Sequence, residues 1–352
     1  MKNPTLSDVA EIAGVSYATA DRVINKRGNV AQKSVRKVEE AMTAIGYVRN
    51  VAAANLSRGR IYRLAFLLPK GRNAFFNQMR VHLNQIANHM QSERVTVDVI
   101  ELAAFSTEGL KNSLQSVIEG NYDGVAAVGL QNDALSAPLK RLREQGVAVI
   151  GLVSDLPLEY RAAYIGIDNK AAGRTAARLI GMSHGGSAGR IQLLAGSLEA
   201  RDHEERVDGF REVIFEDFPN LEILDPIMTH DDASAVRSAT ADALCANPAI
   251  TALYNVGAGN SGLIAALEDH STSASLCCAA HELTAHTRAA LQNKTIDFVI
   301  DQRPDMEINR AFTVLRALID ARDIPPMPDL VPTIYVRDNL PTDAPITPMK
   351  EA

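Results

Sequence analysis

Tryptophan is absent from this 352-residue chain, and aromatic residues make up only 5% of it. Proteins that bind single-stranded nucleic acid stack bases on aromatic side chains, so this shortage argues against such a platform. The cysteines, Cys245, Cys277 and Cys278, are odd in number and fit no disulfide framework. No CxxC or HxxxH spacing offers a metal site. We therefore expect reduced thiols, no bound metal and no cofactor.

Long apolar runs are also missing. No stretch approaches the roughly 18 apolar residues of a membrane-spanning helix, and the first residues, MKNPTLSDVAEIAG, lack the apolar segment of a signal peptide. These absences predict a cytoplasmic protein without a membrane partner. With 46% hydrophobic and 22% charged residues, the composition is that of a globular protein. At about 150 residues per domain, the length predicts two to three folding units.

The net charge of −6 is unevenly distributed. Residues 1–60 hold ten Lys and Arg against five Asp and Glu, whereas the remainder holds 26 against 37. A small basic segment on a large acidic body is typical of a tethered nucleic-acid reader. A chance cluster of surface cations is the alternative interpretation.

The start of the chain has the pattern of short helices. The first is indicated by apolar residues at i, i+3, i+4 and i+7, namely Leu6, Val9, Ala10 and Ala13. Thr5 and Asp8 have the spacing of an N-terminal capping box. Gly14 suits a left-handed cap at the end of this helix.

A second helix is predicted from Tyr17 to about Asn25, with Ser16 as its N-cap, and a third over roughly 32–45. Two short helices joined by a three-residue turn form a helix-turn-helix, whose second helix enters the major groove of DNA. The outward residues near the start of that helix would read bases: Tyr17, Ala18 and Arg22. A small helical bundle without a binding role is the alternative.

The segment 50–60, NVAAANLSRGR, is an alanine-rich stretch between basic residues. It is too short to hold a helix alone in water, but DNA can order it. Leu56 would then be an apolar wedge at a minor-groove base step, and Arg58 and Arg60 would meet phosphates. A plain linker is the other interpretation.

TLSDVAEIAGVSYATADRVIN from Thr5, followed by IGYVRNxxAxxL from Ile45, resembles the N-terminus of the lac repressor/gal repressor family of bacterial regulators. The resemblance implies that Tyr17, Ala18 and Arg22 occupy base-reading positions. It places near phosphates the residues Ser16, Thr19 and Asn25. It assigns to a hinge helix the residues Asn50, Ala53 and Leu56.

Beyond Ile61, apolar strands alternate with helical stretches, which predicts an α/β fold with parallel sheets in two lobes. The expected strands are 63–68, 95–102, 124–129, 147–153, 163–167, 190–195, 250–256, 275–280 and 298–300. Ligands bind such sheets outside the carboxyl ends of the strands. Polar or aromatic residues follow most strands: Asn73, Phe75, Phe76, Gln131, Asn132, Ser154, Asp155, Arg201, Asp202, His203, Asn255, His281, Glu282, Asp301 and Gln302. Taken singly, each also suits a core or surface role.

The body also resembles the type I periplasmic-binding-protein fold, in stretches such as NAFF at 73–76, GSLEARDHEERVDGF from Gly196 and VIDQRP from Val299. By this resemblance, the residues that line an effector cleft are Asn73, Phe75, Phe76, Asp155, Arg201, His203, Asn255, His281 and Gln302. The implied ligand is a small polyhydroxylated molecule, such as a monosaccharide, a sugar alcohol or a derivative.

The expected domains are a helix-turn-helix head (1–48), a hinge (49–60), a two-lobed body (61–340) and a tail (341–352). Lobe 1 comprises about 61–165 and 303–331, and lobe 2 about 166–302 and 332–340. The tail lacks a leucine heptad, which argues against a coiled-coil tetramer.

One motif favours a different function. GAGNSG at 257–262 is a GxGxxG that follows a predicted strand and opens a helix, with Glu282 twenty residues after Gly262. This pattern is the dinucleotide-binding fingerprint, so a nicotinamide-responsive redox sensor or an oxidoreductase is the alternative. No GxSxG nucleophile motif is present. Our prediction is a regulator that is not an enzyme, most simply a repressor that binds a near-palindromic operator as a homodimer under the control of a sugar-like effector.

Overall fold

A computed structural model describes residues 4–24, 30–47, 61–71, 73–90, 94–270 and 276–342. The chain divides into two compact units, residues 1–60 and residues 61–352. The expected hinge over 49–60, with Asn50, Ala53 and Leu56, lies outside the described residues, as do Asn25 and residues 343–352 of the tail.

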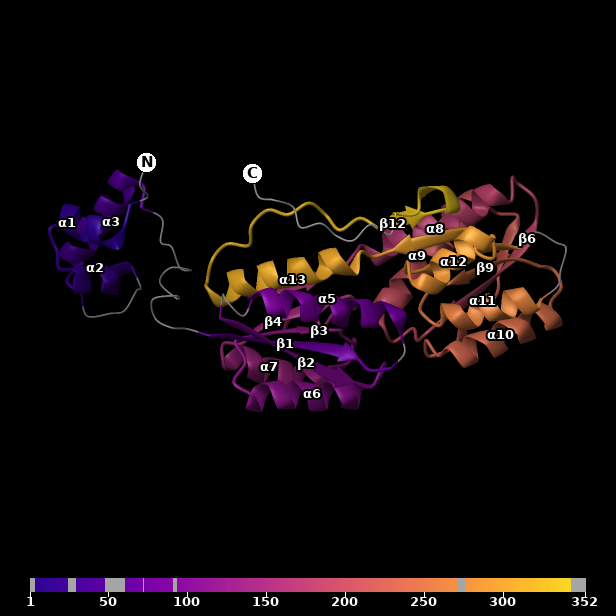
Figure 1. Cartoon of the computed structure of the whole chain (residues 1–352), viewed down its shortest axis with the longest axis horizontal. Coiled ribbons are helices and arrows are strands. Elements are labelled where there is room, and N and C mark those ends of the chain that lie inside the picture. The colour runs from indigo at the N-terminus through magenta and orange to yellow at the C-terminus, as the bar shows by residue number, and fades with distance from the viewer. Residues whose placement is uncertain are drawn as a thin grey trace. The chain divides into compact units, whose positions relative to one another are not determined.

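The first unit holds three helices among its described residues: α1 (Leu6–Ala13), α2 (Tyr17–Ile24) and α3 (Gln32–Ile45) (Figure 1). The capping box is confirmed, because Thr5 Oγ1 accepts the Asp8 N–H and Asp8 Oδ2 accepts the Thr5 N–H at 2.7 Å. Gly14 has φ of 61° and ends α1 in the left-handed conformation, as predicted. The core of this unit joins the three helices through Val9, Ala10, Ala13, Ala20, Val38 and Ala41.

The first sheet of the body is parallel, with strand order β2-β1-β3-β4-β5. Its strands are β1 (Tyr62–Pro69), β2 (Val95–Leu102), β3 (Gly124–Ala127), β4 (Ala148–Leu152) and β5 (Ala163–Ile165). Each predicted strand is present, and the last three are shorter than expected. β1 is buried on both faces, which is the rule for parallel sheets covered by helices.

Helices cover both faces of this sheet: α5 (Ala74–Met90) and α13 (Pro304–Ile319) on one side, α6 (Thr107–Glu119) and α7 (Ser136–Glu144) on the other (Figure 1). Alternate residues of β1 explain the arrangement. Leu64 and Phe66 belong to the core with α5 and α13, whereas Ala65 and Leu67 pack with α6 and α7. We call this layered unit lobe 1.

The second sheet has strand order β12-β11-β10-β9-β6-β7, and β8 also pairs with β6. Its strands are β6 (Gly189–Ala195), β7 (Leu221–Ile223), β8 (Ile227–Met228), β9 (Ile250–Asn255), β10 (Cys277–His281), β11 (Phe298–Asp301) and β12 (Thr333–Tyr335). Only β12 is antiparallel to its neighbour. The short strands β7, β8 and β12 were not predicted, because two or three residues give no period to read.

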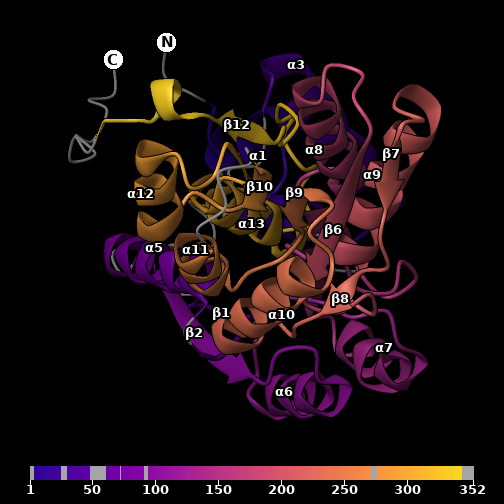
Figure 2. The same cartoon turned by 90° about the vertical axis from the view of Figure 1, so that its right-hand side faces the viewer.

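This sheet and its helices form lobe 2 (Figure 2). Its helices are α8 (Asn169–Ser183), α9 (Arg201–Asp217), α10 (Ala233–Ala246), α11 (Asn260–Asp269) and α12 (Ala285–Asn293). Leu193 and Tyr254 pack with α8 and α9, whereas Leu194 and Leu253 pack with α10, α11 and α12. The sheet is therefore covered on both faces, as in lobe 1.

The chain passes between the lobes three times. It leaves lobe 1 after β5 and enters lobe 2 at α8; it returns after β11 into α13, and it re-enters lobe 2 at β12. Residues 166–168 and 302–303 therefore lie at the first two crossings, and residues 320–332 lead to the third.

Candidate functional site

A cavity of about 240 Å³ lies between the lobes, at the carboxyl ends of both parallel sheets. This volume is below the roughly 300–1,000 Å³ typical of pockets for drug-sized ligands. Lobe 1 lines the cavity with Pro69, Lys70, Gly71, Asn73, Phe75, Phe76, Leu102, Ala104, Phe105, Val128, Gly129, Leu130, Val153 and Ser154. Lobe 2 and the second crossing line it with Ala200, Asp202, His203, Arg206, His230, Asp231, Asp232, Gly257, Ala258, Glu282 and Gln302.

Aromatic residues form the apolar side of the cavity. Asn73 precedes α5, and its Oδ1 accepts the Phe75 N–H at 3.0 Å, which caps the helix. The rings of Phe75 and Phe76 meet edge to face at 5.2 Å. Phe105, from the loop after β2, reaches lobe 2, where its ring lies 5.7 Å from that of His203. The cavity thus has an apolar surface against which a ring can pack.

On the lobe 2 side, α9 directs Asp202, His203 and Arg206 to the cavity. Arg206 is 1% exposed; its Nε donates to Asn169 Oδ1 and its Nη1 to the Val256 carbonyl, each at 2.9 Å. Asp202 Oδ2 lies 3.9 Å from Arg206 Nη2. The Arg206 charge is therefore buried, oriented and partly compensated. Arg206 was not among the sequence-predicted site residues, which were chosen because they closely follow strand ends; it lies more than one helical turn into α9, well beyond the end of β6.

His203 is fixed in one orientation. Its Nδ1 accepts the backbone N–H groups of Gly196 at 3.2 Å and Ser197 at 3.3 Å. A nitrogen that accepts carries no proton, so the proton of the imidazole is on Nε2, which lies 3.7 Å from Asp202 Oδ2.

Glu282 and Gln302 close the deep end of the cavity. They are 5% and 2% exposed, and Gln302 Nε2 donates to Glu282 Oε1. Burial raises the pKa of Glu282 to about 8, and the nearby Asp301 and Asp202 contribute to the rise. The carboxyl is therefore mainly protonated at pH 7, so it can donate as well as accept a hydrogen bond.

Several buried polar atoms of the cavity have no hydrogen-bond partner among the described residues. They are Ser154 Oγ, Asp202 Oδ1, Arg206 Nη2, Glu282 Oε2 and Gln302 Oε1. Leaving such atoms unpaired costs about 1–3 kcal/mol each, so their concentration in one cavity indicates that a polar ligand or water completes them.

Backbone strain is also concentrated here. Five lining residues other than glycine have φ between 51° and 71°: Phe105, Val153, His230, Asp231 and Glu282. This conformation is unfavourable for L residues, above all for a β-branched one such as Val153. Strained backbone gathers at functional sites, which supports the assignment of this cavity as the binding site.

The structure places five of the nine sequence-predicted effector residues in the cavity lining: Asn73, Phe75, Phe76, His203 and Gln302. It places outside the lining Asp155, Arg201, Asn255 and His281. Ser154, Asp202 and Glu282 also line it; they follow predicted strands in the sequence but did not belong to the nine.

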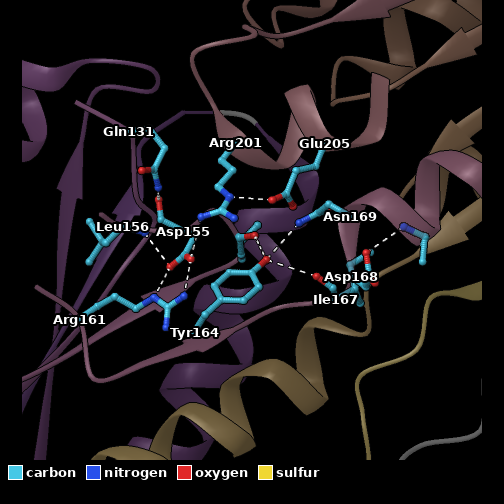
Figure 3. Close-up of polar contacts among 12 residues, drawn as sticks. Gln131, Asp155, Leu156, Arg161, Tyr164, Ile167, Asp168, Asn169, Arg201 and Glu205 are labelled. Atoms are coloured by element: carbon cyan, nitrogen blue, oxygen red, sulfur yellow. Dashed lines mark hydrogen bonds and ion pairs between the residues drawn. The ribbon is translucent and has the colours of Figure 1, made fainter. Parts of the chain in front are cut away.

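Asp155 is the centre of an ion-pair network (Figure 3). Both its oxygens accept from Arg161, at 2.8 and 2.7 Å, and Oδ2 also lies 3.5 Å from Arg201 Nη1. Arg201 Nε in turn donates to Glu205 at 2.6 Å. Because Arg201 belongs to α9 and Asp155 follows β4, the network joins the two lobes beside the cavity.

Asn255 and His281 are fully buried beneath the loop that follows β9. Asn255 Nδ2 donates to Asn260 Oδ1 at 2.7 Å and to the Ala258 carbonyl at 2.9 Å. His281 Nε2 lies 2.8 Å from the Tyr254 hydroxyl, and burial holds its pKa well below the usual value. Both residues therefore support the part of the loop that lines the cavity.

The GAGNSG motif is explained by close packing. A Cβ on Gly257 would lie 2.3 Å from Asp231 Oδ1, and one on Gly262 only 1.8 Å from the Ala233 carbonyl oxygen. Gly262 thus lets α11 approach α10, while Gly257 leaves room beside His203. The glycines meet local steric needs whether or not a nucleotide binds.

In the first unit, the predicted base-reading residues lie on α2. Tyr17 is 57% exposed, and Ala18 and Arg22 are exposed as well, whereas Thr19 is half-buried. Ser16 Oγ accepts the Thr19 N–H at 3.1 Å, so it caps α2 as predicted. The N-terminal side chains of α2 are therefore available for contact with another molecule.

Among the residues that the structure describes, no group of three or more His, Cys, Asp and Glu side chains is placed to hold a metal ion. No helix in that part of the chain is long and apolar enough to cross a membrane.

Two family models match the chain. Residues 64–323 match the periplasmic binding protein domain, and residues 5–50 match the bacterial regulatory proteins of the lacI family. The sequence-based prediction of family and fold class is thereby confirmed.

Curated relatives are regulators. The HTH-type transcriptional regulator DegA of Bacillus subtilis is 25% identical over 213 residues, 60% of this chain and 61% of that protein. CelR of Thermobifida fusca, also an HTH-type transcriptional regulator, is 31% identical over 220 residues, 60% of this chain and 62% of that one. The chain thus matches about three fifths of the length of these relatives.

Solved structures share the fold of the body. A solute binding protein of Burkholderia graminis in complex with D-arabinose has a TM-score of 0.71 and 23% identity, covering 79% of this chain and 96% of that one. The glucose-galactose binding protein GanP of Geobacillus stearothermophilus has a TM-score of 0.72 and 19% identity, covering 80% and 100%. With one model on the head and the other on most of the body, the chain belongs to the lacI family of bacterial regulatory proteins and has a periplasmic binding protein domain.

Proposed function

We propose that this protein is a cytoplasmic transcriptional repressor that binds a near-palindromic operator as a homodimer and releases or holds it according to a small sugar-like effector. The observation that carries the effector role is the interlobe cavity, where buried polar atoms without partners in the described part of the chain face an aromatic surface. Solved structures with the same fold contain D-arabinose, D-allose and D-fucose, which supports this ligand class.

For the DNA-binding role, the support is the helix-turn-helix pattern of α1 and α2, with Tyr17, Ala18 and Arg22 on the second helix. Such a helix offers its N-terminal side chains to base edges in the major groove. A dimer presents two copies, so the operator repeats the half-site about one helical turn apart or at a multiple of that distance.

The two roles are coupled by the lobes. A ligand that contacts both sides of the cavity binds one lobe arrangement more tightly than another, and so shifts the population of DNA-binding dimers. We propose that the hinge over 49–60, with Asn50, Ala53 and Leu56 facing the DNA, responds to that shift. Ser16, Thr19 and Asn25 would contact phosphates.

Two measurements on the full chain test the proposal. Selection from random DNA duplexes should recover one near-palindromic sequence, whose binding weakens steeply with salt. A thermal-shift screen of sugars, sugar alcohols, NAD(H) and NADP(H) should give a shift with one sugar class, and that sugar should change operator affinity. A response to a nicotinamide alone would instead favour the redox-sensor alternative through GAGNSG.

A further inference from the structure

The charge of the effector cavity restricts its ligand more narrowly than its shape does. Ionised carboxylates outnumber cations in the lining: Asp202, Asp231 and Asp232 stand against Lys70 and Arg206, while the protonated Glu282 adds no charge. His203 adds no positive charge in this arrangement, because its Nδ1 accepts two backbone N–H groups. Lys70 and Asp232 are both exposed to solvent, so water and salt screen these two opposite charges, and the less exposed charges of the lining are those of Asp202, Asp231 and Arg206.

Of these two cations of the described lining, only Arg206 is buried, and its charge is already partly compensated. Two of its nitrogens donate to Asn169 and Val256, and Asp202 lies within ion-pair distance of the third. An added anion at Arg206 would therefore compete with Asp202 and raise the negative charge of a low-dielectric site.

The unpartnered atoms point to the same chemistry. Asp202 Oδ1 and Gln302 Oε1 only accept hydrogen bonds, and Glu282 Oε2 and Ser154 Oγ can accept or donate. Of the unpartnered atoms in the described lining, only Arg206 Nη2 is limited to donating. A phosphate or carboxylate group supplies acceptors alone, whereas hydroxyl groups supply a donor to each of these oxygens.

We propose that the cavity takes an uncharged, hydroxyl-rich ligand and discriminates against the phosphorylated and acidic forms of the same sugar. The proposal rests on the effector role argued above and specifies its ligand class. Asp202 opposes an anion by its charge, whereas the carboxyl of Glu282 offers hydrogen bonds to hydroxyl groups; both line the cavity, and Gln302 orients Glu282.

The test is calorimetry on the full-length protein with matched ligands. Aldopentoses and aldohexoses are titrated first, followed by the aldonate and the terminal phosphate ester of each, including those of sugars that show no binding. We expect an uncharged sugar to bind and both of its anionic forms to bind at least about tenfold more weakly.

Two variants localise the effect. Asp202→Asn should reduce several-fold the ratio of the affinity for the neutral sugar to the affinity for its anionic forms; we call this ratio the gap. Asp232→Asn should narrow the gap less than Asp202→Asn does. This variant keeps the cap of α10, because an Asn oxygen can accept the Ala235 N–H that Asp232 now accepts. Asp217→Asn, on an exposed position of α9 outside the lining, is the matched control and should leave the gap unchanged.

A sugar phosphate or aldonate that binds as tightly as the neutral sugar, or more tightly, would overturn the inference while leaving the effector role intact. An unchanged gap in a folded Asp202→Asn protein would overturn it as well. If the folded protein bound no sugar of any charge, the effector role itself would fail, and this inference with it.

Discussion

Arg206 Nε donates a 2.9 Å hydrogen bond to Asn169 Oδ1, and Asn169 Nδ2 lies 3.1 Å from the Tyr164 hydroxyl, which donates to the Val153 carbonyl. These hydrogen bonds connect Arg206, which lines the cavity, to Tyr164 and Asn169, which flank the first crossing between the lobes (Figure 3). A ligand that engages Nη2 of Arg206 would therefore contact a chain of hydrogen bonds that leads to this crossing.

Arg206→Ala should be strongly destabilising, because it leaves Asp202 buried beside a vacated space and removes the donors to Asn169 and Val256. Loss of one partner of a buried ion pair costs about 3–5 kcal/mol. Urea denaturation of the full chain measures it. Arg174→Ala on α8, whose ion pair with Glu212 is 43% and 37% exposed, is the control and should cost less than about 1 kcal/mol. Equal losses for the two variants would contradict the buried role.

The two arginines at Asp155 should differ sharply. Arg161 makes two short hydrogen bonds to a carboxylate that is 7% exposed, so Arg161→Ala should lower the free energy of unfolding by about 3 kcal/mol. Arg201 is 40% exposed and has Glu205 as a second partner, so Arg201→Ala should cost about 1 kcal/mol or less. Denaturation curves compare them, and a larger loss at Arg201 would show that the interlobe contact is the stronger one.

Gly262→Ala should destabilise the body by roughly 1–3 kcal/mol or more, because the new methyl group would meet the Ala233 carbonyl oxygen. The neighbouring exposed Ser261→Ala should change stability by no more than about 0.5 kcal/mol. Thermal unfolding without added nucleotide is the measurement. If Gly262→Ala kept the wild-type stability, packing would not explain why a glycine stands at this position. The dinucleotide-binding interpretation of GAGNSG would then be favoured.

The contribution of Glu282 to stability should fall as pH rises from about 4.5 to about 8. The pKa of Glu282 is raised from 4.5 to about 8 in the folded protein, so in this window the folded state holds a proton that the unfolded state has lost. This contribution to the free energy of unfolding therefore decreases with pH, by a few kcal/mol in total, whereas the lowered pKa of His281 acts in the opposite direction below about pH 6.5. Urea midpoints between pH 5 and 8.5 measure the slope. Glu282→Gln cannot ionise, so the difference in slope between the wild type and this variant gives the Glu282 contribution; an unchanged slope would assign the titration to another group.

Arg22→Ala should relax the base preference at one position in each half-site, a loss of about 1–3 kcal/mol of discrimination. Arg36→Ala removes the same charge from an exposed site on α3 and should at most weaken binding uniformly across sequences. Selection from randomised duplexes with both full-length variants separates the two effects. An unchanged preference in Arg22→Ala would move base reading to another residue.

Much of this fold was predictable from local pattern. Apolar period, caps and glycine breaks located α1, α2 and α3, and apolar runs located β1, β2 and β6. The strand-end rule led to the cavity, because parallel strands bring their carboxyl ends to one edge. The strand-end rule could not tell which of several adjacent residues lines the cavity. Asp202 and Glu282 line it, whereas Asp155 and His281 form hydrogen bonds to Arg161 and Tyr254, residues that only the folded chain brings near.

Arg206 and Phe105 could not be predicted from local pattern. Arg206 lies in the middle of an ordinary charged helix, and its burial follows from the contact of α9 with Asn169 and Val256, which are far apart in the sequence. Phe105 reaches across the cavity from the loop after β2, and its φ of 52° could not be predicted from the local sequence. Both depend on contacts between separate elements rather than on how one element forms.

The return of the chain into lobe 1 at α13 has a consequence for synthesis. Phe312 packs its ring 5.1 Å from that of Phe66, so the core begun by β1 is completed only by a helix far later in the chain. On a ribosome that adds about 5–20 residues each second, nascent chains hold an unfinished lobe 1 for tens of seconds. The head, whose core closes within residues 9–41, has all its parts long before then. The head therefore completes its core early in synthesis and lobe 1 of the body late, so chaperone dependence should fall on the body.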